Sequence, residues 1–317
     1  MSFDPGRIRA TLARERRVAR VVVAEVSGSA PREAGAAMLV WPDGQSGTIG
    51  GGALELDAAS AARLALATGG TTVRRVPLGP ALGQCCGGAV TLVTEVFDAS
   101  KLDALESSAR QGHVLRPVDP DAPALPLRRH LRALRNGSEE PRTLLAGGWF
   151  LEPVARARHA LWLHGAGHVG RAIVATMAPL PDWKITWVDT APDRFPEIPD
   201  GVDILVAADP AQAVAHAPAD AHHLVLTYSH ALDLALCHAV LERGFASAGL
   251  IGSATKWARF RNRLGQLGHA DAAISRIRCP IGDPRLGKHP QAIAIGVTKA
   301  LLEATASSDR TAMERPA

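Results

Sequence analysis

The hydrophobic and polar positions of the first third of the chain predict a mixed domain of strands and helices. Four apolar runs have the length of strands and lie at residues 18–26, 36–41, 72–77 and 89–97. Apolar residues at helical spacing predict helices over residues 5–17 and near 53–67. We therefore expect an α+β domain over residues 1–115.

From residue 157 onward, strand patterns alternate with helical patterns. The strand patterns lie at residues 159–164, 183–189, 202–206, 222–227 and 246–251, and the helical ones at 169–177, 232–243, 253–268 and 290–304. Because parallel strands need crossover connections, this alternation predicts a doubly wound parallel sheet over residues 157–306. The whole chain is thus expected to be α/β, with a disordered tail at 307–317.

The stretch between the two regions, residues 116–156, has a weak periodic pattern. Its six prolines lie at positions 117, 120, 123, 126, 141 and 153. Proline clusters interrupt both helices and sheets, so we interpret this stretch as a connection with a short hairpin near residues 144–150.

Composition agrees with a folded two-domain chain of 317 residues, since 47% of the residues are hydrophobic and 21% are charged. The net charge of +4 is spread along the sequence without a block of like charges, so we expect no nucleic-acid partner. The N-terminus has no signal-peptide pattern, and no apolar run reaches the roughly 18 residues of a membrane span. We therefore expect a cytoplasmic protein without a membrane partner.

The most unusual stretch is a glycine-flanked loop that contains Gln84, Cys85 and Cys86. Neighbouring cysteines cannot easily bridge each other, and thiolates are soft ligands suited to a soft metal or a sulfur centre. Without histidine partners the two thiols do not complete a tetrahedral zinc site. The alternative is that both thiols are buried as small hydrophobic side chains, as we expect for Cys237 and Cys279.

Two further loops of the first domain carry chemistry suited to an anionic cofactor. One contains Arg32, and the other runs from residue 47 to Glu55 and includes the cluster around Gly51. Together they offer backbone N–H donors and one cation. In the alternative interpretation, Arg32 pairs with Glu33 or Glu55 in a structural network.

The second domain opens with the pattern G-x-G-x-x-G, formed by Gly165, Gly167 and Gly170 with His168 inside the loop. The loop follows an apolar strand and begins a helix, and Asp189 ends the next strand nineteen positions after the last glycine. This context is that of a Rossmann nucleotide site, in which Asp189 would accept from a ribose hydroxyl and would disfavour the 2′-phosphate of NADP. The alternative is a purely structural turn, since such a sheet needs one with or without a ligand.

His230 and Lys256 each follow a predicted strand of the second domain. Open α/β sheets bind ligands at the carboxyl ends of their strands, so His230 is a candidate base or anion contact and Lys256 a candidate phosphate contact. Equally, the residues around His230 would simply cap a helix, and Lys256 would be a surface cation.

In their order, these motifs resemble the XdhC/CoxI family of molybdenum-enzyme accessory proteins. The matching stretches are residues 29–33, 47–55, 84–88, 163–170, 229–233, 249–256 and 279–282. The resemblance covers nearly the whole chain. One departure is Tyr228, where the family often has histidine.

The resemblance implies a chaperone that binds the molybdenum cofactor (molybdopterin), protects it, supports its sulfuration and inserts it into xanthine dehydrogenase or a related molybdenum hydroxylase of purine catabolism. It makes Cys85 and Cys86 the candidates for holding the metal or its sulfur. The implied partners are the apo-dehydrogenase, a cysteine desulfurase and a second copy of the chain in a homodimer. We expect no enzyme activity of its own. The alternatives are an NAD-dependent oxidoreductase that uses the second domain, and a sulfur-transfer enzyme with a cysteine persulfide.

Overall fold

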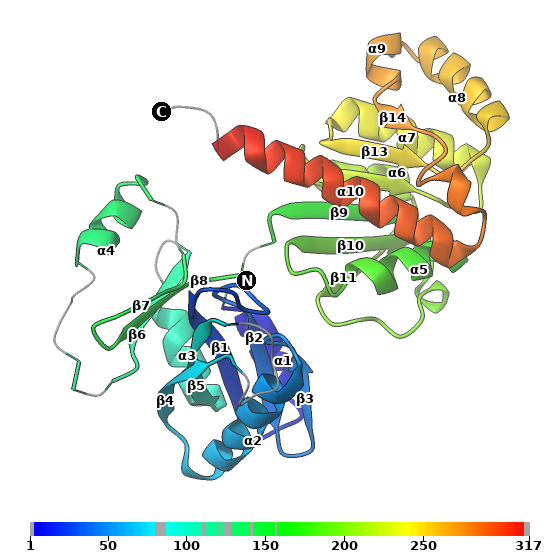
Figure 1. The fold of residues 1–317 in the computed structure, drawn as a ribbon. Helices are drawn as coiled ribbons and strands as arrows, with labels where there is room; N and C mark the ends of the chain where they lie inside the picture. The colour runs from blue at the N-terminus through cyan, green and yellow to red at the C-terminus, as the bar shows by residue number, and fades with distance from the viewer. Residues whose placement is uncertain are drawn as a thin grey trace. The chain divides into compact units, whose positions relative to one another are not determined.

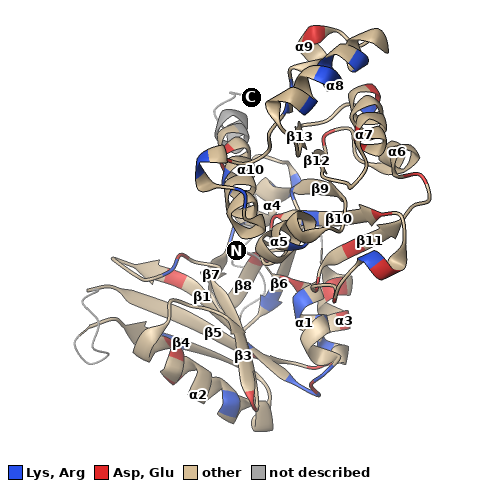
Figure 2. Cartoon of the chain, turned by 90° about the vertical axis from the view of Figure 1, so that its right-hand side faces the viewer, with Lys and Arg blue, Asp and Glu red and all other residues tan. Residues whose placement is uncertain are grey.

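The structure, a computed structural model, describes residues 3–79, 87–109, 112–119, 121–122, 128–139, 142–155 and 157–313. The chain forms two compact units, residues 1–156 and 157–317 (Figure 1). Lys and Arg residues occur on elements of both units (Figure 2). In the described part of the chain, no helix combines the length and the apolar character that a membrane span requires.

The first unit is built on an antiparallel sheet of five strands in the order β3-β2-β1-β5-β4. The strands are β1 (Val18–Ser27), β2 (Ala37–Trp41), β3 (Gly44–Gly47), β4 (Thr71–Pro77) and β5 (Ala89–Phe97). Helix α2 (Gly52–Thr68) packs on one face, where Val21 and Val23 of β1 contact its alanines. The alternate residue Val22 is buried on the opposite face, which explains why β1 is apolar at successive positions.

The opposite face of this sheet is covered by two helices and a second sheet. The helices are α1 (Pro5–Leu12) and α3 (Ala99–Ser108), and the second sheet consists of β6 (His113–Pro117), β7 (Leu144–Ala146) and β8 (Trp149–Pro153). Helix α4 (Arg128–Arg135) lies in the same part of the chain. The sequence predicted a connection over 116–156 with a hairpin near 144–150. The structure places that hairpin in the three-stranded sheet, within the first unit.

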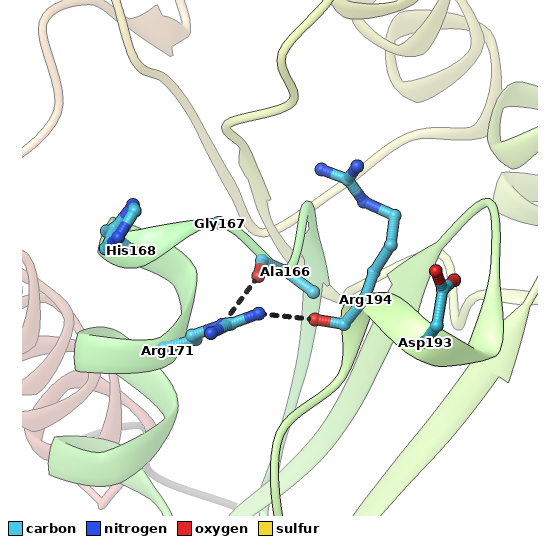
Figure 3. Close-up of a pocket in the computed structure, with 6 residues that line it drawn as sticks. All are labelled: Ala166, Gly167, His168, Arg171, Asp193 and Arg194. Atoms are coloured by element: carbon cyan, nitrogen blue, oxygen red, sulfur yellow. Dashed lines mark hydrogen bonds between the residues drawn. The ribbon is translucent and has the colours of Figure 1, made fainter.

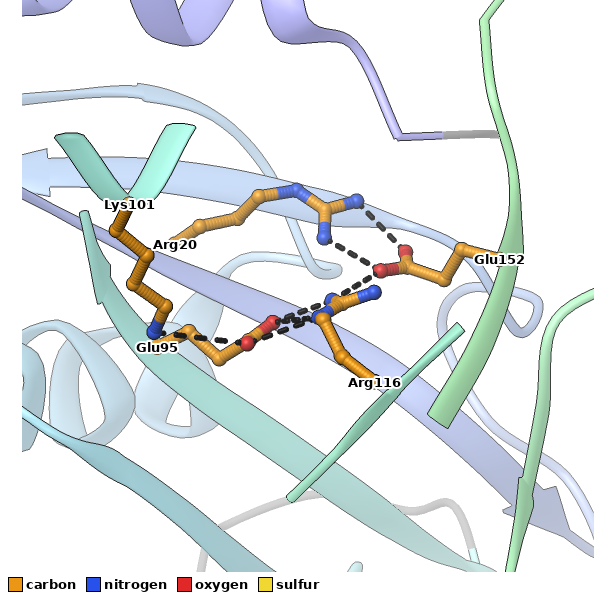
Figure 4. A network of polar contacts seen from close by, with 5 residues as sticks. All are labelled: Arg20, Glu95, Lys101, Arg116 and Glu152. Carbon is orange, nitrogen blue, oxygen red and sulfur yellow. Dashed lines mark hydrogen bonds and ion pairs between the residues drawn. The ribbon is translucent and has the colours of Figure 1, made fainter. Parts of the chain in front are cut away.

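A buried charge network joins the two sheets (Figure 4). Arg20 of β1 donates to Glu152 of β8 at 2.8 and 2.9 Å, and Arg116 of β6 donates to Glu95 of β5 at 2.9 Å and also contacts Glu152. Burial would raise the pKa of Glu152, but the charges of Arg20 and Arg116 lower it to about 2. Removing one member of such a network leaves a buried charge unpaired, so the network fixes the second sheet against the first.

The second unit contains six parallel strands in the order β11-β10-β9-β12-β13-β14. They are β9 (His159–His164), β10 (Trp183–Asp189), β11 (Val202–Val206), β12 (His222–Val225), β13 (Ser247–Leu250) and β14 (Ile277–Arg278). The predicted fold class, a mixed α+β unit followed by a doubly wound parallel sheet, is confirmed. The strand order reverses between β9 and β12, and open α/β sheets bind ligands at this point.

Helices cover both faces of the parallel sheet. Helices α5 (His168–Met177) and α10 (Pro290–Met313) pack on one face, and α7 (His230–Arg243) and α8 (Ala254–Gln266) on the other. Short helices α6 (Pro210–Ala213) and α9 (Asp271–Ile274) complete the unit. The unit begins at residue 157, where the sequence analysis starts its second domain, and α10 runs seven residues beyond the predicted end at 306.

Candidate functional site

The glycine loop of the second unit connects β9 to α5 and is shaped by two close approaches. A Cβ on Gly165, whose φ is +121°, would lie 2.5 Å from the carbonyl oxygen of Leu226, and a Cβ on Gly170 would lie 2.1 Å from that of Gly165. Both positions therefore require glycine. At Gly167, in contrast, a Cβ would meet no atom within 4 Å, so this residue faces open space at the start of α5.

Asp189, at the end of β10, is bound to this loop. One oxygen of its buried carboxylate accepts from the Ala166 N–H at 2.6 Å, and the other accepts from the Thr190 N–H at 2.7 Å. The second oxygen also forms an ion pair with the Nε of Arg194 at 2.8 Å. The oxygens that the sequence assigns to a ribose hydroxyl are therefore already in contact with the protein.

An open cavity of about 380 Å³ lies over the loop (Figure 3). It is lined by Ala166, Gly167, His168, Arg171, Asp193 and Arg194. Arg171 of α5 donates to the carbonyl oxygen of Ala166 at 3.0 Å and to that of Arg194 at 2.8 Å. It thereby fixes the loop against the 3-10 helix η2 (Pro192–Arg194).

Sequence reasoning identified Gly167 and His168 in this cavity but missed Arg171, Asp193 and Arg194. The position of Arg171 directly after the third glycine could have indicated that its side chain lies near the loop. Arg194 follows Asp189 by five residues in an irregular segment, where no periodic pattern marks a functional side chain.

The other two predicted residues of this unit lie outside the set that lines the cavity. His230 is exposed at the first position of α7, whose N-terminus is capped by Ser229. Lys256 forms an ion pair with the buried Asp233 at 2.6 Å and donates to the carbonyl oxygen of Ile251 at 2.9 Å. Lys256 therefore cross-links α7, α8 and the end of β13, a structural role that the sequence analysis did not foresee.

Two buried histidines lie side by side, His164 at the end of β9 and His223 in the second position of β12. The rings of His164 and His223 stack at 5.6 Å, with 3.3 Å between the Nε2 of His164 and the Nδ1 of His223. Burial, together with the neighbouring imidazole, lowers the pKa of His164 to about 3, and burial with a contribution from His222 lowers that of His223 to about 4. Both rings are therefore neutral at pH 7, and His164 directly precedes Gly165 of the glycine loop.

In the first unit, one of the predicted loops meets the base of the cysteine loop, and the other predicted loop meets the first. A Cβ on Gly28 would lie 3.2 Å from the Cα of Gly88, and a Cβ on Gly88 would lie 2.3 Å from the carbonyl oxygen of Ser29. A Cβ on Gly50 would lie 2.5 Å from the Cβ of Pro31. Glycine at these positions thus allows the segment at residues 28–32 to contact both Gly88 and Gly50.

Glu55 fixes the glycine loop at the start of α2. Its carboxylate accepts from the hydroxyl of Thr48 at 2.6 Å and from the N–H groups of Ile49 and Gly51 at 3.0 and 3.1 Å. Burial raises the pKa of Glu55, but these hydrogen bonds together lower it by a larger amount, so the pKa lies below its usual value. Two N–H groups that the sequence analysis offered to a ligand are therefore bound within the protein.

Arg32 forms an ion pair with Glu33 at 3.3 Å, as one of the two interpretations of the sequence expected. About a quarter of its side chain (26%) is exposed beside Gly50.

Gln84, Cys85 and Cys86 lie outside the described residues. The base of their loop is closed by a hydrogen bond of 2.7 Å from the Leu78 N–H to the carbonyl oxygen of Gly88. Among the described residues, a Cβ at Gly79 or at Gly87 would meet no atom within 4 Å. Within the described ranges, no group of three His, Cys, Asp or Glu side chains is placed to hold a metal ion.

Comparison with known proteins finds similarity in both units. Residues 11–77 match the model of the XdhC and CoxI family, and residues 161–299 match that of the XdhC Rossmann domain. The uncharacterized protein YqeB of Escherichia coli (strain K12) is 30% identical over 191 residues, which cover 59% of this chain and 35% of YqeB. The chain thus spans about a third of the length of this curated relative.

A crystal structure described as a xanthine dehydrogenase from Bacillus halodurans has the same fold. It superposes with a TM-score of 0.66 at 20% sequence identity, and the match covers 96% of each chain.

Proposed function

The chain belongs to the XdhC and CoxI family, and from this premise we propose that it is an accessory protein that carries the molybdenum cofactor to xanthine dehydrogenase or a related molybdenum hydroxylase. The cofactor is the cargo of this protein: it is bound, protected, kept available for sulfuration and then inserted into the client. Family membership and the fold shared with the protein described as a xanthine dehydrogenase support the accessory role.

The observation that carries this proposal is that the segment at residues 28–32 contacts Gly88, at the base of the cysteine loop, and also contacts Gly50. Glycine at these contacts lets the backbone segments approach closely, because a Cβ there would overlap a neighbouring atom. Among the described residues, a Cβ at Gly51, Gly79 or Gly87 would meet no atom within 4 Å, and glycine there presents no Cβ to a bulky pterin ligand.

The donors at this place suit the cargo. Cys85 and Cys86 would supply soft thiolate ligands for the metal or its sulfur, and Gln84 would supply an amide. The partly exposed Arg32 would pair with the phosphate of the pterin. The cargo itself brings a molybdenum centre that reacts only after transfer to the client, so the protein needs no turnover of its own.

The partners of such a carrier follow from its task. The proposal includes the apo-hydroxylase as recipient, a cysteine desulfurase as sulfur source and a second copy of the chain as a homodimer.

The test is anaerobic binding of isolated molybdenum cofactor to the purified full chain, read as bound molybdenum and as fluorescence of the oxidised pterin. We expect near-stoichiometric cofactor on the wild type and loss of most of it in the Cys85→Ala/Cys86→Ala variant. Cys279→Ala, in the second unit, is the matched control and should retain the cofactor.

If the double variant retained as much cofactor as the wild type, the two thiols would not be the groups that hold it. Absence of cofactor on the wild type would contradict the carrier function. If NAD then bound and turned over with a substrate, the second unit would instead be that of an oxidoreductase.

A further inference from the structure

Helix α2 of the first unit is apolar on both of its faces. Its inner face packs Leu54 and several alanines on the antiparallel sheet. On its outer face, however, Leu56 is 70% exposed and Leu64 is 77% exposed. A surface helix normally presents charged side chains to water, and a helix that is apolar all round is normally covered. The outer face of α2 therefore has the character of an interface.

The exposed residues of this outer face form one continuous stripe. They are Ala53, Leu56, Ser60, Leu64 and Ala67. With 3.6 residues per turn, they fall within about 80° of the helix circumference. The hydroxyl of Ser60 donates to the carbonyl oxygen of Leu56 at 2.9 Å, so it needs no partner from outside the helix. A partner can therefore bury this outer stripe without leaving the serine hydroxyl unpaired.

The outer stripe has the same pattern in both chain directions about Ser60. Leu56 and Leu64 lie four residues on either side of this serine. Ala53 and Ala67 lie seven residues on either side of it. If a second copy of the helix packs antiparallel on the first, each leucine meets the opposite leucine of the other copy, and alanine meets alanine. An isologous dimer requires such a self-complementary surface, whereas a different partner does not.

The charges beside the outer stripe agree with a second copy as its partner. Asp57 and Arg63 lie three residues on either side of Ser60, so antiparallel packing places Asp57 of each copy at the level of Arg63 of the other. Asp57 also pairs with Arg74 of β4 at 2.5 Å, but 47% of the Asp57 side chain stays exposed. The acid and the base that each copy brings to the contact are therefore balanced by those of the other.

We propose that two copies of this chain associate through α2, with the helices antiparallel and Ser60 at the two-fold axis. The inference rests on the homodimer of the proposed function and assigns a surface to it. A helix of 17 residues is about 25 Å long, so the contact is small for an interface and we expect a dissociation constant in the micromolar range. Because α2 begins at the glycine loop of the first unit, the two copies of that loop lie at opposite ends of the helix pair.

Sedimentation velocity of the full chain between about 1 and 100 µM tests the proposal, and we expect a dimer that dissociates on dilution. Leu56→Glu/Leu64→Glu should weaken the dimer at least about a hundredfold, because both leucines of each copy lose their burial and like charges meet. Both side chains are exposed in the single chain, so the variant should fold normally, which circular dichroism checks. Leu267→Glu/Leu286→Glu, at two exposed leucines of the second unit, is the matched control and should dimerise as the wild type does.

Disulfide cross-linking tests the antiparallel register. The chain used has alanine in place of every cysteine except the buried Cys237. In it, Ser60→Cys should cross-link two copies on oxidation with diamide, because this position meets itself at the two-fold axis. Ala53→Cys should not, since its counterpart lies about 20 Å away at the other end of the helix pair. Parallel helices would instead cross-link at both positions.

A wild type that stays monomeric over the whole range would overturn the proposal. If the Leu56→Glu/Leu64→Glu variant of such a monomer failed to activate the client enzyme, the outer stripe would belong to the client instead. A dimer that persists unchanged in this variant would place the contact elsewhere on the chain, and cross-linking of Ala53→Cys would contradict the antiparallel register. These assays contain no molybdenum cofactor, and the Cys85→Ala/Cys86→Ala variant should dimerise normally. Their failure is therefore distinguishable from failure of the cargo test.

Discussion

Each unit contains a glycine loop that leads into a helix, and the two loops are stabilised in different ways. In the first unit, Glu55 from the following helix binds the amides of Ile49 and Gly51. In the second unit, Asp189 comes from a neighbouring strand and binds the amide of Ala166. The first loop thus uses its own donors to begin a helix, whereas the second leaves Gly167 facing a cavity. Similar glycine clusters in sequence can therefore serve as an internal cap or as the wall of a cavity.

The largest expected difference between the units is their response to acid. Burial depresses the folded-state pKa of His164 to about 3 and of His223 to about 4, so below the unfolded value of 6.5 the unfolded chain binds more protons. Stability is fully present above pH 6.5 and is lost as the pH falls towards 4, by several kcal/mol for the two histidines together.

Thermal unfolding of the second unit should therefore shift to lower temperature between pH 6.5 and 4, and the His164→Leu/His223→Leu variant should show a flatter pH profile. The same slope in the variant and the wild type would show that other groups cause the acid sensitivity.

A matched pair of glycine substitutions tests the division of roles within the second loop. Gly170→Ala places a Cβ at 2.1 Å from the carbonyl oxygen of Gly165, so we expect a loss of about 3 kcal/mol of unfolding free energy. Gly167→Ala meets no atom within 4 Å and should change stability by less than about 0.5 kcal/mol. Denaturant unfolding measures both, and equal losses would contradict the assignment of Gly167 to an open surface.

A smaller effect is expected from Glu55→Gln in the first loop. The neutral amide loses the charge that strengthens the hydrogen bonds to Thr48, Ile49 and Gly51, at a cost of about 1 kcal/mol at pH 7. Because the folded pKa of Glu55 is lowered, its contribution is present above the usual glutamate pKa and disappears as the pH falls below it. Unfolding curves of the variant and the wild type should thus converge at low pH; a constant gap would show that the charge has no role.

Local sequence patterns were sufficient to predict the parallel sheet and its glycine loop, because strand, turn and helix signals there are consecutive. Gly165 and Gly170 lie where the pattern required close packing. Asp189 was placed at the correct strand end, but its contacts with Ala166 and Arg194 join residues that are twenty-three and five positions away, respectively. The structural role of Lys256 could not be predicted for the same reason, since its partner Asp233 lies on another helix.

The second sheet of the first unit shows a different limit of sequence patterns. Its strands are three to five residues long, and prolines lie at the ends of two of them, so no periodicity develops. They are held by the apolar contacts of Phe150 and by ion pairs such as Arg20–Glu152, which joins residues 132 positions apart. Ion pairs between residues so far apart leave no periodic pattern in the sequence.

The charge network also sets where the polypeptide can be cut. A fragment that ends at residue 115 would keep Arg20 and Glu95 but lose Arg116, Glu152 and the second sheet, so the face of the first sheet that carries Arg20 and Glu95 would lose its cover. The N-terminal segment also depends on the second sheet, because the backbone of Phe3 forms hydrogen bonds with residues 153 and 155. The shortest autonomous piece of the first unit must therefore extend to about residue 155, and a split-protein design would have to place its junction after that point.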